Sequence, residues 1–158
     1  MVIMLDKKGA VLANFGKRGG GTGPGEFKFP TEIVAAGDEL FVLDSGNARI
    51  QVLDLRGHFR KEITVFDAAH SAGLAVDKGK KIYVSDPELN RLQVLNYDGQ
   101  LLYTVGNTGS GVAEFNEISG IWLDSERCLY VVDTKNKRVQ LFNTGGLSAG
   151  GCQGLGPG

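Results

Sequence analysis

The sequence predicts an all-β protein built from repeated sheets of about four antiparallel strands. The same residue pattern occurs three times, and its aspartates, Asp44, Asp86 and Asp133, lie 42 and then 47 residues apart. Each copy contains short runs rich in Val, Ile, Leu, Tyr and Phe, separated by Gly, Asn and Asp clusters, which is typical of strands and turns. No stretch shows the 3.6-residue apolar period of a helix. Repeated β-hairpins are therefore the expected building blocks.

The expected strands follow in order from these repeats. Two strands are expected before Gly16, because Gly9 occupies the same turn position as Gly57 and Gly99. Four strands are expected in each of the next two copies and three in the last, which makes thirteen. The best-defined pairs are Leu40–Asp44 with Arg49–Asp54, Ile82–Asp86 with Arg91–Asn96, and Leu129–Asp133 with Arg138–Asn143.

Strands of this kind, apolar on both sides, need a cover on both faces of their sheet. Stacked sheets meet that need, and a repeat of about 40 to 45 residues with four strands is the blade of a β-propeller. Trp122 falls between Ile121 and Leu123 in an inner strand, so we expect it in the core. About three blades are expected, and an incomplete ring leaves open strand edges that invite association.

The repeat motifs resemble those of the NHL-repeat family. Gly25-Glu26-Phe27-Lys28-Phe29-Pro30 is similar to that family's glycine-rich lead and Phe-x-x-Pro element, and Asp44-Ser45-Gly46-Asn47-Ala48-Arg49 to its Asp-x-x-Asn-x-Arg hairpin. The third copy matches at Glu114-Phe115 and at 133–138, but has Ile118 in place of the proline. The second copy has Leu89 in place of the Asn and lacks the glycine-rich lead. The resemblance covers residues 2–143 and is closest to stand-alone bacterial NHL proteins.

This resemblance implies blades of a six-bladed propeller over residues 1–143, so three blades are half of a ring. Either the chain is part of a longer protein, which its opening in mid-repeat favours, or two copies form a homodimer that completes one ring. Residues 144–158 carry no charge and seven glycines, and we expect them to form a disordered tail.

Composition excludes some function classes. The net charge is −1 and the pI is near 6.1, without the basic surplus of a protein that binds mainly phosphates. No apolar run reaches the roughly 18 residues of a membrane span. Asp6 precedes any signal-peptide core, so the chain as it stands predicts a cytoplasmic protein, although bacterial NHL relatives are often exported. The compartment therefore stays open.

One carboxylate and one arginine recur five residues apart in every copy. The pairs are Asp44 with Arg49, Asp86 with Arg91, and Asp133 with Arg138. Three equivalent carboxylates could ring a channel and bind a metal. The structural interpretation is favoured, because an Asp that enters a tight hairpin accepts turn N–H bonds and the Arg can pair with it or with backbone carbonyls.

No catalytic residue, metal site or cofactor is predicted. His58 and His70 lack the ligand spacing of a zinc site, and no Gly-x-Ser-x-Gly elbow is present. Cys128 and Cys152 show no metal or redox spacing, and Cys128 is expected to be a buried, inert thiol. The segment 17–23 could bind an anion through its amides, but is expected to be a flexible lead into a blade.

The expected binding surface is the loop-rich end of the blades, because rigid scaffolds carry function on their loops. Its candidate residues are Lys17, Arg18, Glu88, Lys135 and Lys137, with loops 17–29 and 107–116. The first hypothesis is a non-catalytic module or scaffold that binds a protein partner. The alternatives are an RNA-binding propeller and a propeller lyase or lactone hydrolase, since fold alone does not choose. The basic region of the RNA-binding alternative would consist of Lys17, Arg18, Lys135, Lys137 and Arg138.

Overall fold

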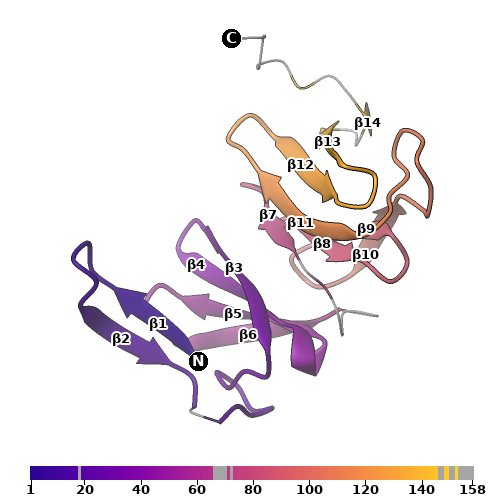
Figure 1. The fold of residues 1–158 in the computed structure, drawn as a ribbon. Coiled ribbons are helices and arrows are strands. Elements are labelled where there is room, and N and C mark those ends of the chain that lie inside the picture. The colour runs from indigo at the N-terminus through magenta and orange to yellow at the C-terminus, as the bar shows by residue number, and fades with distance from the viewer. Residues whose placement is uncertain (18, 66–70, 72, 146–147, 150–151, 153–158) are drawn as a thin grey trace. The chain divides into compact units, whose positions relative to one another are not determined.

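The computed structural model describes residues 1–17, 19–65, 71, 73–145, 148–149 and 152. Its regular structure is β-sheet, with one 3-10 turn, and no α-helix occurs in these residues. The chain divides into two compact units, Met1–Ser71 and Ala72–Gly158, which are described separately below. Figure 1 shows the order of the strands.

The first unit contains a two-stranded and a four-stranded sheet. Its strands are β1 (Val2–Leu5), β2 (Val11–Phe15), β3 (Pro30–Ala36), β4 (Glu39–Asp44), β5 (Arg49–Asp54) and β6 (Phe59–Thr64), with the 3-10 turn η1 (Ser45–Asn47) between β4 and β5. β1 pairs with β2, and β3 to β6 form an antiparallel sheet in chain order. Val2 packs against a core of Phe27, Val42 and Leu53, which joins the two sheets of this unit.

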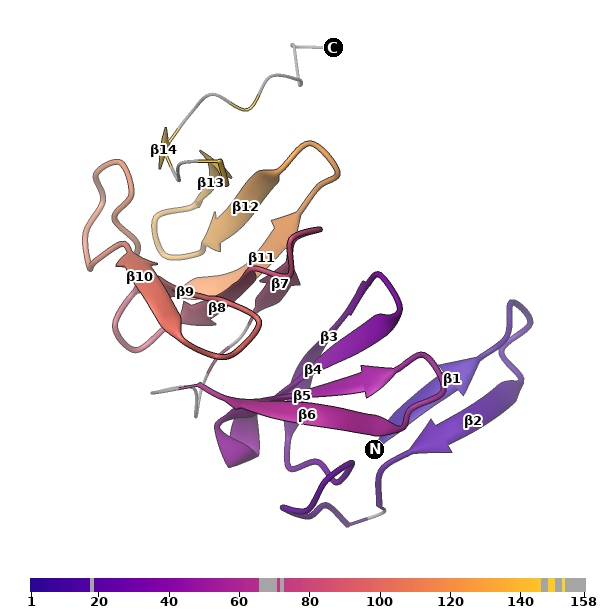
Figure 2. The same cartoon turned by 180° about the vertical axis from the view of Figure 1, so that it is seen from behind.

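The second unit contains two four-stranded sheets. The strands are β7 (Leu74–Val76), β8 (Ile82–Asp86), β9 (Arg91–Leu95), β10 (Leu101–Val105), β11 (Ile118–Leu123), β12 (Cys128–Asp133), β13 (Arg138–Asn143) and β14 (Ser148–Ala149). β7 to β10 form one sheet and β11 to β14 the other, each in chain order. Both views show β7 beside β11 (Figures 1 and 2), and Tyr83, Leu92, Leu129 and Phe142 share the core between the sheets.

The repeat predicts the hairpin register residue by residue. Asp44 lies opposite Arg49, Asp86 opposite Arg91, and Asp133 opposite Arg138. Each Asp is thus the last residue of one strand and each Arg the first residue of the next. Because both side chains of such a pair point to the same face of the sheet, the five-residue spacing brings opposite charges together.

Glycine is required where the chain leaves one blade-like sheet for the next. Gly106 follows β10 with a φ of +101°, and a Cβ placed on it would lie 2.4 Å from Cε2 of Phe115. Gly16 follows β2 with a φ of +88°, and a Cβ there would lie 2.8 Å from Cδ2 of Phe27. At both places the missing side chain lets the backbone lie directly on a buried phenylalanine ring.

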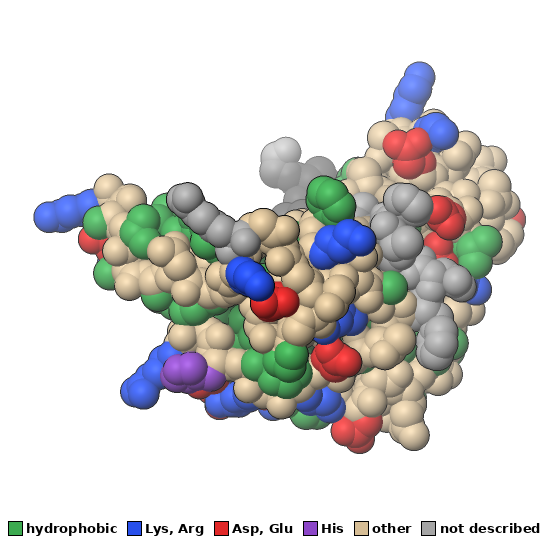
Figure 3. Space-filling view, turned by 90° about the horizontal axis from the view of Figure 1, so that it is seen from below, with side chains coloured by type: hydrophobic (Ala, Val, Ile, Leu, Met, Phe, Trp, Pro, Cys, Tyr) green, Lys and Arg blue, Asp and Glu red, His purple; other side chains and the backbone are tan. Residues whose placement is uncertain are grey.

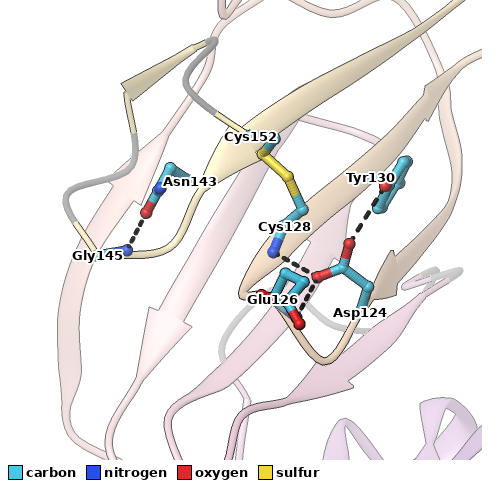
Figure 4. The surroundings of a disulfide bond; sticks show 7 residues. All are labelled: Asp124, Glu126, Cys128, Tyr130, Asn143, Gly145 and Cys152. Atoms are coloured by element: carbon cyan, nitrogen blue, oxygen red, sulfur yellow. Dashed lines mark hydrogen bonds between the residues drawn. A yellow bond between two sulfur atoms is a disulfide. The ribbon is translucent and has the colours of Figure 1, made fainter. Parts of the chain in front are cut away.

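The prediction for Cys128 is wrong, because its sulfur is bonded to that of Cys152 (Figure 4). Asn143 of β13 pairs with Ser148 of β14, so the chain reverses and brings the two cysteine Cα atoms to 5.7 Å. Ser148 and Cys152 both lie within the expected tail. Residues 146–147, 150–151 and 153–158 of that tail lie outside the described residues, and the domain boundary at residue 143 stays a prediction.

Trp122 is not in the core, contrary to expectation. Its side chain is 62% exposed, whereas its neighbour Ile121 is buried. Alternate residues of a strand point to opposite faces of the sheet. Ile121 therefore faces the sheet β7–β10, and Trp122 faces away from it.

Candidate functional site

The hairpin aspartate of the first repeat is the centre of a buried hydrogen-bond network. Asp44 Oδ1 accepts a bond of 2.6 Å from the backbone N–H of Lys28. Asp44 Oδ2 accepts bonds from Arg49 Nε at 2.9 Å, Asn47 Nδ2 at 2.8 Å and Gln51 Nε2 at 3.4 Å. The Asp44 side chain is fully buried, so these donors replace the water that an ionised carboxylate needs.

The arginine of the same hairpin binds the glycine-rich loop that leads into β3. Arg49 Nη1 donates to the carbonyl of Thr22 at 2.8 Å, and Nη2 donates to the carbonyls of Gly23 and Glu26 at 2.9 Å. Nη1 also donates to Glu62 Oε2 on β6 at 2.7 Å. The carbonyl oxygens of Thr22, Gly23 and Glu26 thus point toward a cation, whereas an anion-binding nest presents backbone amides.

The third repeat reproduces the bonds between the hairpin and its loop. Asp133 accepts bonds from the N–H of Asn116 and from the side chains of Asn136, Arg138 and Gln140 at 2.7 to 3.2 Å. Arg138 donates to the carbonyls of Ser110, Gly111 and Glu114, which are the counterparts of Thr22, Gly23 and Glu26. Burial raises the pKa of the Asp133 carboxyl, but the hydrogen bonds from Asn116, Asn136, Arg138 and Gln140 together bring that pKa below its ordinary value.

The second repeat shows the centre of the same network. Arg91 Nε donates to Asp86 Oδ2 at 2.9 Å. Leu89 cannot donate from its side chain, and its backbone N–H donates to Asp86 Oδ1 at 3.1 Å instead. Most of the segment that leads into β7 lies outside the described residues, including His70. Across all three repeats, the recurrent Asp and Arg side chains are occupied in fixing the hairpins, so we interpret them as structural.

At one end of the second unit, one connecting loop is hydrogen-bonded to two hairpin tips. Asn90, in the β8–β9 tip, donates from Nδ2 to Thr108 Oγ1 at 3.0 Å and accepts from Glu117 N at 2.7 Å. In the β12–β13 tip, the backbone N–H of Lys135 donates to the Asn116 carbonyl at 3.0 Å. The loop 106–117 therefore runs between the two tips and is fixed to both of them.

Comparison with known proteins agrees with this architecture. Residues 71–155 match the model of a family described as 6-bladed beta-propeller. The chain belongs to this family. NHL repeat-containing protein 3 of Homo sapiens is 33% identical to it over 97 residues, which are 60% of this chain and 28% of that protein. The predicted NHL-repeat family is thereby confirmed, and the chain spans less than a third of the length of this relative.

Solved structures show the same propeller fold. A structure titled Kuenenia stuttgartiensis Hydrazine Synthase superposes with a TM-score of 0.61 and 18% identity, over 85% of this chain and 38% of that one. A structure titled Streptogramin B lyase gives the same TM-score and identity, over 92% of this chain and 45% of that one. The four-stranded sheets are accordingly propeller blades, as the repeat period predicts.

Four of the five charged residues predicted for binding lie on loops that the structure describes. Lys17 follows β2 and lies 3.7 Å from Glu26, while Arg18 is outside the described residues. In the second unit, Glu88 is exposed in the β8–β9 tip, Lys137 is exposed in the β12–β13 tip, and Lys135 pairs with Glu117 at 3.0 Å. The structure brings these last three to one end of that unit.

Basic and acidic side chains alternate on the surface. On the face drawn in Figure 3, Lys and Arg lie interspersed with Asp and Glu. The ion pairs Lys135–Glu117 and Arg60–Asp38, each at 3.0 Å, are examples from the two units. This distribution differs from the continuous basic stripe expected of a nucleic-acid-binding surface.

The opposite ends of the blades carry a repeated turn. An Asp or Asn side chain accepts two backbone N–H bonds of 2.8 to 3.0 Å within its own turn, at Asp6, Asp54, Asp77, Asn96 and Asp124. At Asp124, the second oxygen accepts a bond from the Tyr130 hydroxyl at 3.2 Å, and burial followed by this bond raises the pKa of Tyr130. The Asp/Asn-x-x-Gly pattern before Gly9, Gly57 and Gly99 is a signal that identifies three of these turns.

His58 belongs to one of these turns. Its ring Nδ1 lies 2.9 Å from Asp54 Oδ2, at the exposed β5–β6 connection. Within the described part of the chain, no three His, Cys, Asp or Glu side chains are grouped as metal ligands. None of its helices is long and apolar enough to cross a membrane.

Proposed function

We propose that this propeller is a non-catalytic binding module that holds a protein partner on the loop end of its second unit. We define this loop surface by Glu88, Leu89, Val112, Lys135 and Lys137. The observation that supports it most is the fixation of loop 106–117 to both hairpin tips, described above. A surface that is rigid before binding loses little conformational entropy on association.

The composition of the loop surface fits a protein partner. Val112 is 76% exposed and Leu89 is 49% exposed, and Lys135 and Lys137 are exposed in the β12–β13 tip at the same end of the unit. Exposed apolar side chains with a polar rim are typical of protein interfaces. The RNA alternative has less support, because Lys135 is paired with Glu117 and the net charge is −1.

A cross-linking experiment tests the proposal. A photoreactive amino acid replaces Val112 in the full chain, the cross-linked protein is identified, and the purified partner is titrated with the unmodified propeller by calorimetry. Leu89→Asp should weaken the measured affinity at least tenfold, because it introduces a charge into the apolar centre of the interface. Lys78→Ala, in the exposed β7–β8 turn at the other end of the blade, should leave affinity unchanged.

Two results would overturn this assignment. One is equal loss of affinity in the Leu89→Asp and Lys78→Ala variants. The other is salt-dependent binding of a single-stranded RNA oligonucleotide that Lys135→Ala and Lys137→Ala abolish, which would establish the RNA-binding alternative. Conversion of a lactone substrate by the purified chain would support the enzymatic alternative.

A further inference from the structure

The last blade presents an apolar face that no other described segment covers. Trp122 of β11, Tyr130 and Val132 of β12, and Val139 and Leu141 of β13 point to the same side, because Trp122 pairs with Tyr130, Tyr130 with Leu141, and Val132 with Val139. Trp122 is 62% exposed, Val139 52% and Val132 39%. The Trp122 and Tyr130 rings are in contact, with centroids 5.2 Å apart. We call these five residues the terminal face.

The preceding blade shows how such a face is normally covered. Counted from the hairpin aspartate, Tyr130, Val139 and Leu141 correspond to Tyr83, Leu92 and Val94. All three of those residues are fully buried, in the core that the sheet β7–β10 forms with β11–β14. The terminal face therefore has the residue pattern of a surface that receives another blade.

The first hairpin presents the complementary kind of face. Asp6 and Asn143 occupy the same turn position, and each accepts a backbone N–H bond two residues ahead. Leu5 thus corresponds to Phe142, which is fully buried against the sheet β7–β10. Leu5, its strand partner Val11, and Ile3 are 49% to 59% exposed. We call these three residues the hairpin face.

We propose that the terminal face binds the hairpin face of a second copy of this chain. The contact would repeat the one between consecutive blades, since each side offers the positions that already pack together inside the second unit. Neither face contains a charged residue, so no ionised group has to lose its water on association. The contact joins two different surfaces, so it is head-to-tail.

Light scattering and fluorescence of the full chain test the association. Trp122 is the single tryptophan, so its emission reports the terminal face alone. With rising concentration, the mass should increase from 16.8 kDa toward twice that value, and the emission should shift to shorter wavelength. A constant mass of 16.8 kDa up to high concentration would overturn the proposal.

A pair of variants tests the head-to-tail geometry. Val139→Glu disables the terminal face and Ile3→Glu disables the hairpin face, so each variant alone should remain a monomer. A mixture of the two should form a heterodimer, because one terminal face and one hairpin face remain intact. Leu55→Glu, at an exposed leucine in the β5–β6 turn, is the matched control and should associate like the natural chain.

Other outcomes are equally decisive. Dimers of the Ile3→Glu variant would mean that two terminal faces pair with each other, which contradicts the proposed contact. A mixture that stays monomeric while both variants retain the β-sheet circular dichroism of the natural chain would also contradict it.

Discussion

Arg49 donates from Nε to Asp44 Oδ2 over 2.9 Å, and neither side chain is more than 10% exposed. The pair lies at the end of the β4–β5 hairpin, where the Asp also accepts a hydrogen bond from the Lys28 N–H and the Arg also donates to carbonyls of the loop before β3. One ion pair thus fastens a hairpin to the loop that precedes it. This arrangement explains why the sequence repeats the two residues together.

Replacement of Asp44 by Ala should strongly destabilise the protein. The change leaves Arg49 Nε and the Lys28 N–H without their acceptor, and removal of one partner of a buried ion pair costs about 3 to 5 kcal/mol. The free energy of unfolding, measured in urea, checks the value. Asp38→Ala is the control, because Asp38 is 71% exposed in its pair with Arg60 and an exposed ion pair contributes about 0 to 1 kcal/mol. Equal losses in the two variants would contradict the structural role of Asp44.

The Asp133 carboxyl should make stability depend on pH. Its pKa in the folded protein lies below the ordinary value of 3.8, so the unfolded chain binds the proton more readily. The stabilisation is therefore fully present above the ordinary pKa and is lost as the pH falls through the lower pKa of the folded protein. Urea unfolding between pH 7 and pH 2 measures this dependence.

Asp133→Asn removes the titrating group and serves as the comparison for that experiment. The variant should be less stable at pH 7, and its stability should fall less steeply below pH 4 than that of the natural chain. Identical slopes for both proteins would show that Asp133 does not contribute to the acid sensitivity.

Gly106→Ala should disturb the junction between β10 and β11. Alanine is strained at a φ of +101°, and its Cβ would lie 2.4 Å from the Phe115 ring, which is buried in the core. Backbone strain and overpacking each cost about 1 to 3 kcal/mol, so we expect a loss of about 3 kcal/mol in the urea experiment. Gly120→Ala is the control, since no atom lies within 4 Å of its added Cβ. A loss in Gly120→Ala as large as in Gly106→Ala would contradict this explanation.

Local spacing accounts for most of what the sequence predicts correctly. The Asp–Arg interval, the strand runs and the turn glycines are all short-range signals, and they define the hairpins and the blade period. The exposure of Trp122 was missed for a physical reason. Alternation divides Ile121 and Trp122 between two faces, but which face meets another sheet depends on the neighbouring blades.

The Cys128–Cys152 bond was missed for a related reason. It depends on the chain reversal at β14, where Ser148 pairs with Asn143, and a strand that the structure describes over two residues is too short for a recognisable alternation of apolar residues. The Asp and Asn turns, by contrast, can be predicted from the sequence. Asp6 and Asp54 each lie three residues before a turn glycine, and their side chains accept hydrogen bonds from backbone N–H groups of the same turn.

Arg138→Lys should loosen loop 106–117 more than it destabilises the fold. Lysine keeps the charge beside Asp133 but cannot reproduce the planar fork that reaches the carbonyls of Ser110, Gly111 and Glu114. Hydrogen exchange of the loop amides should accelerate, while the amides of β12 should keep their protection. Lys137→Arg is the control, since its exposed side chain lies outside the network. Arg138 lies outside the loop surface. If binding needs a rigid loop surface, Arg138→Lys should nevertheless weaken the affinity for the partner identified by cross-linking. Unchanged affinity together with faster exchange of the loop amides would show that binding does not depend on loop order.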